Sequence, residues 1–215
     1  APGAVTPTRG VAQEDTSAGP AVPRVVAETT VVATPVSRFV FSNIGAMLLD
    51  AELAQYRSLT ADSGQVQLAR EGEPLLRYRL QSGADTISLS SVAFRAERGA
   101  TPSGAPTLRF TGNVGNRVIS LDYRFVPDSY VVRVEGTVTG GSSAGRLLID
   151  LPSGSRSGEG ATGEGQRHLA IAYKPTAGNA KRVTFQDLDP GERVVEPRPL
   201  TWVVAKNKYF LVGGL

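Results

Sequence analysis

Two glycine-rich segments of the sequence fit motifs that carry catalytic or cofactor chemistry. Residues 141–145 match G-x-S-x-G, in which a serine nucleophile requires a strand-to-helix turn and a nearby histidine. Residues 158–163 match G-x-G-x-x-G, which binds a dinucleotide only where a helix starts directly after the loop. Strands are expected on both sides of the first segment, and the second leads into an apolar strand at 169–173. We therefore interpret both segments as turns or loops, without a nucleophile or a cofactor.

Residues that could bind a metal or transfer a proton are few. His168 is the only histidine and the chain has no cysteine, which removes thiolate ligands and most transition-metal sites. The His168 side chain is expected on the surface, facing away from the apolar side of strand 169–173. Residues 187–192 place three carboxylates in one segment, but they lack the length and spacing of a Ca²⁺ loop. The segment is interpreted as an Asp-Pro-Gly turn with calcium as an alternative, and neither a catalytic nor a metal site is predicted.

The densest cluster of aromatic and basic residues lies near the end of the sequence. One interpretation is a final core strand, or a short helix, whose lysines reach solvent. The other is a contact with a membrane interface, where Trp, Tyr and Lys side chains are favoured. Both interpretations stay open, and the candidate interface residues are Trp202, Lys206, Lys208, Tyr209 and Phe210.

The elements that must position these residues are mainly strands. Apolar and polar side chains alternate in residues 117–125, and they alternate again in residues 130–139 after a Val-Pro-Asp-Ser turn. This pattern predicts an antiparallel hairpin with one solvent-exposed face. Helical spacing occurs only at residues 50–56, where Leu49, Leu53 and Tyr56 could share a face. Further strands are predicted at 25–33, 37–42, 76–80, 108–111, 146–151, 169–173 and 182–186. Many strands with almost no helix predict an all-β sandwich.

Composition separates a linker from this domain. Residues 1–24 contain four prolines and three glycines but no aromatic residue, which predicts a flexible linker before a domain at 25–215. The net charge of +3 is spread along the chain and does not indicate nucleic-acid binding. No apolar run approaches the ~20 residues that span a bilayer.

The C-terminal cluster and several other segments resemble one known family. Residues 201–211, Thr-Trp-Val-Val-Ala-Lys-Asn-Lys-Tyr-Phe-Leu, resemble the "GWVA…QxYFL" signature that closes the large periplasmic domain of bacterial YidC insertases, of the YidC/Oxa/Alb family. Residues 25–29 resemble its "VxVET" opening, 41–46 its "xxxGGxI" segment, 51–56 its "LxxY" segment and 128–134 its "GDYxIxV" hairpin. Residues 172–174 and 185–188 resemble its "AYK…F.DL" run. Ile44 and Thr201 stand where the family has glycine.

The resemblance implies a β-supersandwich, similar to galactose-mutarotase-like domains, on the periplasmic side of the bacterial inner membrane. It also implies that residues 201–215 lead toward a transmembrane helix of the same polypeptide. The expected function is non-catalytic: a monomeric domain that assists membrane-protein insertion and folding. The expected partners are the membrane-embedded insertase core, Sec translocon accessory subunits and nascent membrane proteins, with no cofactor.

Two alternatives belong to other classes of protein. A mutarotase-like enzyme would need a general acid and base over a sugar, and His168 is the only histidine available. A carbohydrate-binding module would need exposed aromatic platforms, and the chain has a single tryptophan.

Overall fold

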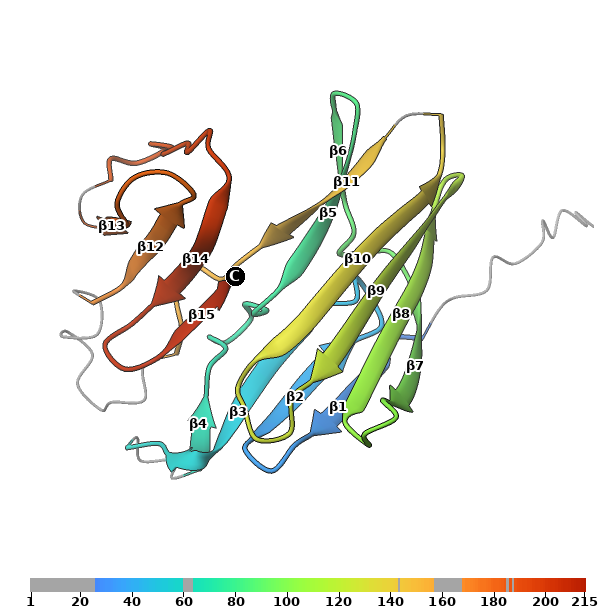
Figure 1. The fold of residues 1–215 in the computed structure, drawn as a ribbon, viewed down its shortest axis with the longest axis horizontal. Coiled ribbons are helices and arrows are strands. Elements are labelled where there is room, and N and C mark those ends of the chain that lie inside the picture. The colour runs from blue at the N-terminus through green and yellow to red at the C-terminus, as the bar shows by residue number, and fades with distance from the viewer. Residues whose placement is uncertain (1–25, 60–63, 143, 157–167, 185, 187) are drawn as a thin grey trace, which may run out of the picture.

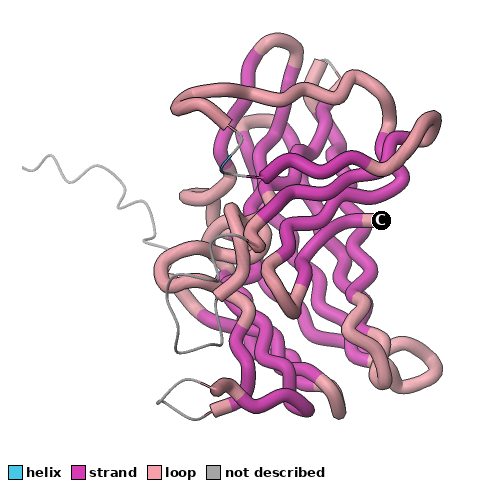
Figure 2. The backbone as a smooth tube through the Cα atoms, turned by 90° about the vertical axis from the view of Figure 1, so that its left-hand side faces the viewer, coloured by secondary structure: helices cyan, strands magenta, loops and turns pink. Residues whose placement is uncertain are grey.

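The computed structural model describes residues 26–59, 64–142, 144–156, 168–184, 186 and 188–215. These residues form antiparallel strands joined by turns and loops, and Figure 2 shows that nearly all of the described chain is strand or loop. No helix within these ranges is long and apolar enough to cross a membrane. The all-β prediction is confirmed. The mutarotase-like supersandwich and the division into a linker at 1–24 and a domain at 25–215 stay predictions, and residues 1–25 lie outside the described ranges.

The strands form four sheets (Figure 1). The first has the order β1-β2-β3-β4 and contains β1 (Thr29–Ala33), β2 (Ser37–Ser42), β3 (Leu48–Arg57) and β4 (Gln65–Gln67). The second has the order β10-β9-β8-β7 and contains β7 (Phe94–Ala100), β8 (Pro106–Val114), β9 (Arg117–Phe125) and β10 (Val132–Gly140). The third has the order β11-β5-β6 and contains β5 (Arg77–Ser82), β6 (Asp85–Ser88) and β11 (Gly145–Asp150). The fourth has the order β13-β12-β14-β15 and contains β12 (Ala170–Pro175), β13 (Lys181–Thr184), β14 (Leu200–Lys206) and β15 (Leu211–Gly214).

The first two sheets pack face to face and enclose an aromatic core. Phe41 of β2 lies 4.8 Å from the Tyr123 ring and 6.0 Å from the Phe125 ring of β9, measured between ring centroids. Alternate residues of β9 from Arg117 to Phe125 are buried, as the period of two in the sequence predicts. The hairpin of β9 and β10 is also confirmed, and its turn closes with the Ser129 N–H donating to the Val126 carbonyl.

The fourth sheet lies beside this sandwich, at the left of Figure 1. Phe210 and Val212, from the hairpin of β14 and β15, pack against the hydrophobic core of the sandwich. The Arg156 N–H donates to the carbonyl of Leu68, which joins the chain leading toward the fourth sheet to the segment after β4. The C-terminal hairpin is therefore held against the sandwich.

The helix predicted at residues 50–56 is wrong, because these residues belong to β3. Val40 pairs with Asp50 and Phe41 pairs with Leu48, so Leu49 is an extra residue in β3 and forms a β-bulge. The bulge shifts the alternation along β3, and Leu48, Ala51 and Leu53 become its buried residues. Leu49, Leu53 and Tyr56, whose spacing resembles that of a helix, do not share a face: Leu49 is half-buried at the bulge, Leu53 is buried and Tyr56 is exposed.

A pair of buried tyrosines gives the sandwich a predictable response to alkaline pH. The Tyr78 and Tyr123 hydroxyls lie 2.5 Å apart, and the Tyr123 hydroxyl also donates to the Ala46 carbonyl at 3.4 Å. Burial raises the pKa of Tyr78 to about 12, although the Tyr123 hydroxyl opposes the shift. Burial, with the neighbouring Tyr78, raises the pKa of Tyr123 well above its ordinary value.

We expect the free energy of unfolding to fall as the pH rises from about 10 toward 12. In this range the unfolded chain loses tyrosine protons that the folded chain retains, which costs about 1.4 kcal/mol per pH unit for each tyrosine. Tyr78→Phe removes one such group, and urea unfolding between pH 8.5 and 11.5 should give a shallower slope for this variant. Equal slopes for the variant and the parent chain would contradict the assignment, because lysine deprotonation is common to both.

Candidate functional site

The turn between β14 and β15 carries the centre of the predicted interface, and Asn207 organises it. The buried Asn207 side chain accepts hydrogen bonds through Oδ1 from the N–H groups of Tyr209, at 2.8 Å, and Phe210, at 2.7 Å. Its Nδ2 donates to the Arg156 carbonyl at 3.2 Å. Asparagine suits such a turn because its short amide can bond nearby backbone groups. The hydrogen bonds fix the chain direction at the two aromatic residues.

The structure divides the five predicted interface residues into two sets. Trp202 and Lys206 lie four residues apart in β14, on one face of the strand, and both are half-buried. Lys208 and Tyr209 are exposed at the turn, with the Lys208 ammonium 5.0 Å from the centroid of the Tyr209 ring. Phe210 is half-buried against the sandwich. The segment is therefore strand and turn, which confirms the strand interpretation over the short helix.

Four rings from three distant segments meet at this turn, and we name them the aromatic cluster: Tyr56, Tyr130, Tyr209 and Phe210. Centroid distances are 6.2 Å from Tyr56 to Tyr130, 5.7 Å from Tyr56 to Phe210 and 6.5 Å from Tyr209 to Phe210. The Tyr130 hydroxyl donates to the Gln55 side chain at 3.1 Å. Desolvation, with the nearby Tyr56 hydroxyl, raises the pKa of Tyr130. Exposed fractions of 47% for Tyr56, 43% for Tyr130 and 59% for Tyr209 leave much of the cluster open to a partner.

Sequence reasoning missed half of the aromatic cluster. Tyr56 lies in the segment whose spacing predicts a helix, and the alternation of residues 130–139 places Tyr130 on the apolar side of a strand. Tyr56 lies at the exposed end of β3, and Tyr130 lies in the turn that leads into β10. Aromatic residues at strand ends carry no local signal of their own, because only the packing of the C-terminal hairpin brings them together.

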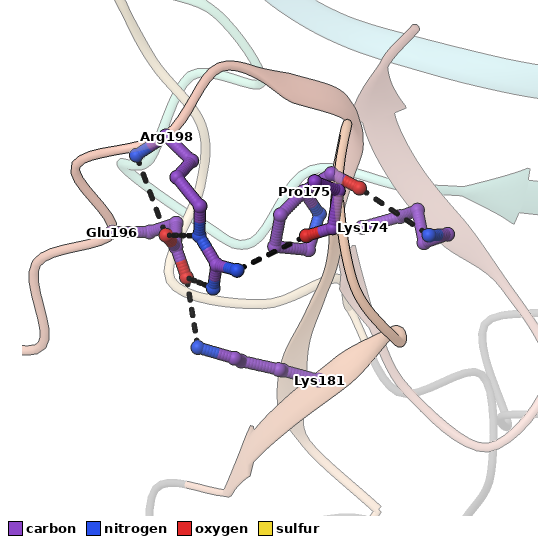
Figure 3. A network of polar contacts seen from close by, with 6 residues as sticks. Lys174, Pro175, Lys181, Glu196 and Arg198 are labelled. Atoms are coloured by element: carbon purple, nitrogen blue, oxygen red, sulfur yellow. Dashed lines mark hydrogen bonds and ion pairs between the residues drawn. The ribbon is translucent and has the colours of Figure 1, made fainter.

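A network of charges near the other end of the fourth sheet is satisfied internally (Figure 3). The Glu196 carboxylate accepts from the Arg198 guanidinium at 2.7 and 3.0 Å and from the Lys181 ammonium at 2.8 Å. Hydrogen bonds from Arg198 and then Lys181 hold the pKa of Glu196 at about 2. Arg198 also donates to the Ala177 carbonyl, and Lys174 donates to the carbonyls of Pro175 and Gly178. The network joins the chain before β14 to β13 and to the turn after β12.

The catalytic and metal motifs gain no support from the described residues. Residues 141–144 lie between β10 and β11, and Gly145 begins β11, so two strands flank the G-x-S-x-G match as expected. Ser143 lies outside the described ranges. His168 is half-buried just before β12, and residues 158–163 are not described. The Glu192 N–H donates to the Asp189 carbonyl, which closes the predicted turn, while Asp187 is not described. Among the residues that the structure covers, no three His, Cys, Asp or Glu side chains gather as metal ligands.

Antiparallel sheets, an aromatic core and an exposed aromatic turn define the chain as an all-β sandwich domain. A family model, the YidC periplasmic domain, matches residues 29–213, and the chain belongs to this family. The match extends from β1 to β15 and so includes the sandwich, the fourth sheet and the aromatic cluster. The family relates the chain to the periplasmic side of a membrane insertase, in agreement with the resemblance in the sequence. The chain matches no curated protein and no solved structure.

Proposed function

We propose that this domain assists membrane-protein insertion without catalysis, by scaffolding the insertase and by contacting Sec translocon subunits or emerging polypeptide. Membership of the YidC periplasmic domain family supports its place in an insertase. The membrane-embedded core of the same polypeptide is the permanent partner in this proposal. The Sec subunits and the substrate polypeptide are transient partners.

The single observation that carries the proposed contact is the aromatic cluster. Tyrosine and phenylalanine provide large contact areas for little loss of side-chain entropy, and such rings are enriched where proteins bind one another. The Tyr56 ring contacts Tyr130 and Phe210, so the surface is assembled before a partner arrives. The Tyr130 and Tyr209 rings keep a large exposed fraction beside this contact.

The ring geometry favours a polypeptide over a sugar. Neighbouring rings of the cluster are inclined by 55° between Tyr56 and Tyr130, 85° between Tyr56 and Phe210, and 61° between Tyr209 and Phe210. No two of these neighbouring rings share a plane, so they form an uneven apolar surface and not a flat platform for a pyranose. Side chains of an extended or helical segment can fill such a surface.

Photo-crosslinking in cells tests the proposal in the full-length insertase that carries this domain. Probes replace Tyr56, Tyr130 and Tyr209 one at a time, and a control probe replaces Val118, which is exposed on β9. We expect crosslinks to Sec subunits or nascent chains from the three cluster positions and not from position 118. If the cluster probes find only lipid or the membrane helices of the same protein, the domain is a structural spacer and the proposed contact is wrong.

A further inference from the structure

The register of β12 to β15 divides the fourth sheet into two faces with different chemistry. Residues paired directly across antiparallel strands project to the same side of a sheet. Tyr173 pairs with Lys181 and Val203, and Ala205 pairs with Ile171 and Val212. On this face Tyr173 and Ala205 are buried, and Val212 packs against the core of the sandwich. Because Val212 packs against the sandwich, this side is the inner face of the sheet, although Ala170 on the opposite side is buried as well.

The opposite face is formed by three cross-strand rows. In the first row Lys174 lies opposite Trp202. In the second row Ala172 of β12 lies between Arg182 of β13 and Val204 of β14 and pairs with both. In the third row Lys206 lies opposite Ala170 and Leu211. Adjacent rows are about 7 Å apart, since each strand advances about 3.4 Å per residue. We name this side the basic face and define it by Lys174, Arg182, Trp202, Val204, Lys206 and Leu211.

Positive charge on the basic face is not balanced within the sheet. No strand residue that shares this face is acidic, whereas Lys181 on the inner face is paired with Glu196. Lys174 donates to two backbone carbonyls and forms no ion pair with a carboxylate of the described residues. Within the described part of the chain, Arg182 and Lys206 form no ion pair. Three cations thus stand around Trp202 and Val204.

We propose that the basic face binds the surface of a bilayer that contains anionic phospholipid. Each lysine or arginine close to an anionic leaflet contributes about 1 kcal/mol to binding, so three cations on one face act together. Trp202 lies in the first row, and tryptophan prefers the headgroup region, where its ring is in an apolar environment and its N–H stays hydrated. The exposed Leu211 and the half-buried Val204 add apolar area on the same side. Long lysine and arginine stems can pack over this area while their charges reach the phosphates.

The 215-residue chain contains a single tryptophan, which makes Trp202 a reporter at the proposed contact. Vesicles of phosphatidylglycerol mixed with phosphatidylcholine should shift its emission to the blue and carry the protein into the vesicle pellet. Vesicles of phosphatidylcholine alone should do neither. Binding should also fall steeply as salt rises from about 0.1 to 1 M, because the Debye length falls from about 10 to 3 Å.

A charge-matched pair of variants separates this face from the general basicity of the chain. Lys174→Gln, Arg182→Gln and Lys206→Gln together remove three positive charges from the basic face and should weaken binding roughly 100-fold. Arg38→Gln, Arg98→Gln and Arg133→Gln remove three exposed charges from β2, β7 and β10 and should weaken it by less than about threefold. Unfolding curves of both triple variants should match that of the parent chain.

Two outcomes would overturn the proposal. The first is an unshifted Trp202 emission together with no pelleting on the mixed vesicles. The second is an equal loss of affinity in the two triple variants, which would mean that net charge alone drives binding. The basic face contains none of the rings of the aromatic cluster, so either result leaves the crosslinking test of the proposed function unaffected.

Discussion

Replacing Phe41 by alanine is expected to lower the free energy of unfolding by about 3–5 kcal/mol, the range for removing a fully buried phenylalanine. Phe41 has no exposed surface and lies between the two sheets of the sandwich. Its ring meets Phe110 at 5.9 Å, Tyr123 at 4.8 Å and Phe125 at 6.0 Å. Alanine would leave a cavity that these three rings cannot close, because each also packs against other members of the core.

Urea unfolding with two control variants measures this effect. Phe41→Leu keeps an apolar side chain of similar length and should cost about 1–2 kcal/mol, because part of the cavity is filled. Val118→Ala shortens an exposed residue of the neighbouring strand β9 and should change stability by less than about 0.5 kcal/mol. A loss for Phe41→Ala no larger than that for Val118→Ala would show that the two sheets do not share one aromatic core.

Local pattern predicted the strands well wherever one residue faces the core and the next faces solvent. β2 and β9 have the bounds that the sequence predicts, since alternation is unbroken along β9 and fails in β2 only at its last residue, the buried Ser42. The sequence does not predict β3, because the bulge at Leu49 interrupts the alternation of its apolar and polar residues. β4 and β6 have three and four residues, too few to establish a period, and β7 is mostly exposed, so alternation is weak there.

The candidate site was predictable only where its residues are neighbours in the sequence. Lys208, Tyr209 and Phe210 are consecutive, so this cluster of aromatic and basic residues can be recognised in the sequence. Tyr56 and Tyr130 join them through tertiary packing, over separations that no local pattern records. The basic face likewise depends on the register of β12 against β13 and β14, which includes a shift between Lys174 and Pro175. A slip of one residue would move its charges to the inner face.

Asn207→Ala is expected to cost about 2–4 kcal/mol and to loosen the aromatic cluster. The substitution removes the acceptor of the Tyr209 and Phe210 N–H groups and the donor to the Arg156 carbonyl. Each polar group left without a partner in a partly buried position costs about 1–3 kcal/mol. Urea unfolding measures the total loss. Hydrogen exchange of the Tyr209 and Phe210 amides, which should become markedly faster, shows whether the turn itself has opened.

Asn207→Asp distinguishes the turn from the contact with Arg156. Aspartate keeps the oxygen that accepts from the two turn amides but loses the Nδ2 donor, so exchange at Tyr209 and Phe210 should stay slow. If Asp and Ala accelerate exchange equally, the Arg156 bond, and not the turn, holds the hairpin. The proposed function also predicts a difference in crosslinking between the two variants, which a measurement of stability alone would not reveal. Because Phe210 would leave the Tyr56 ring, Asn207→Ala should reduce crosslinking from the cluster in the full-length insertase, while Asn207→Asp should preserve it.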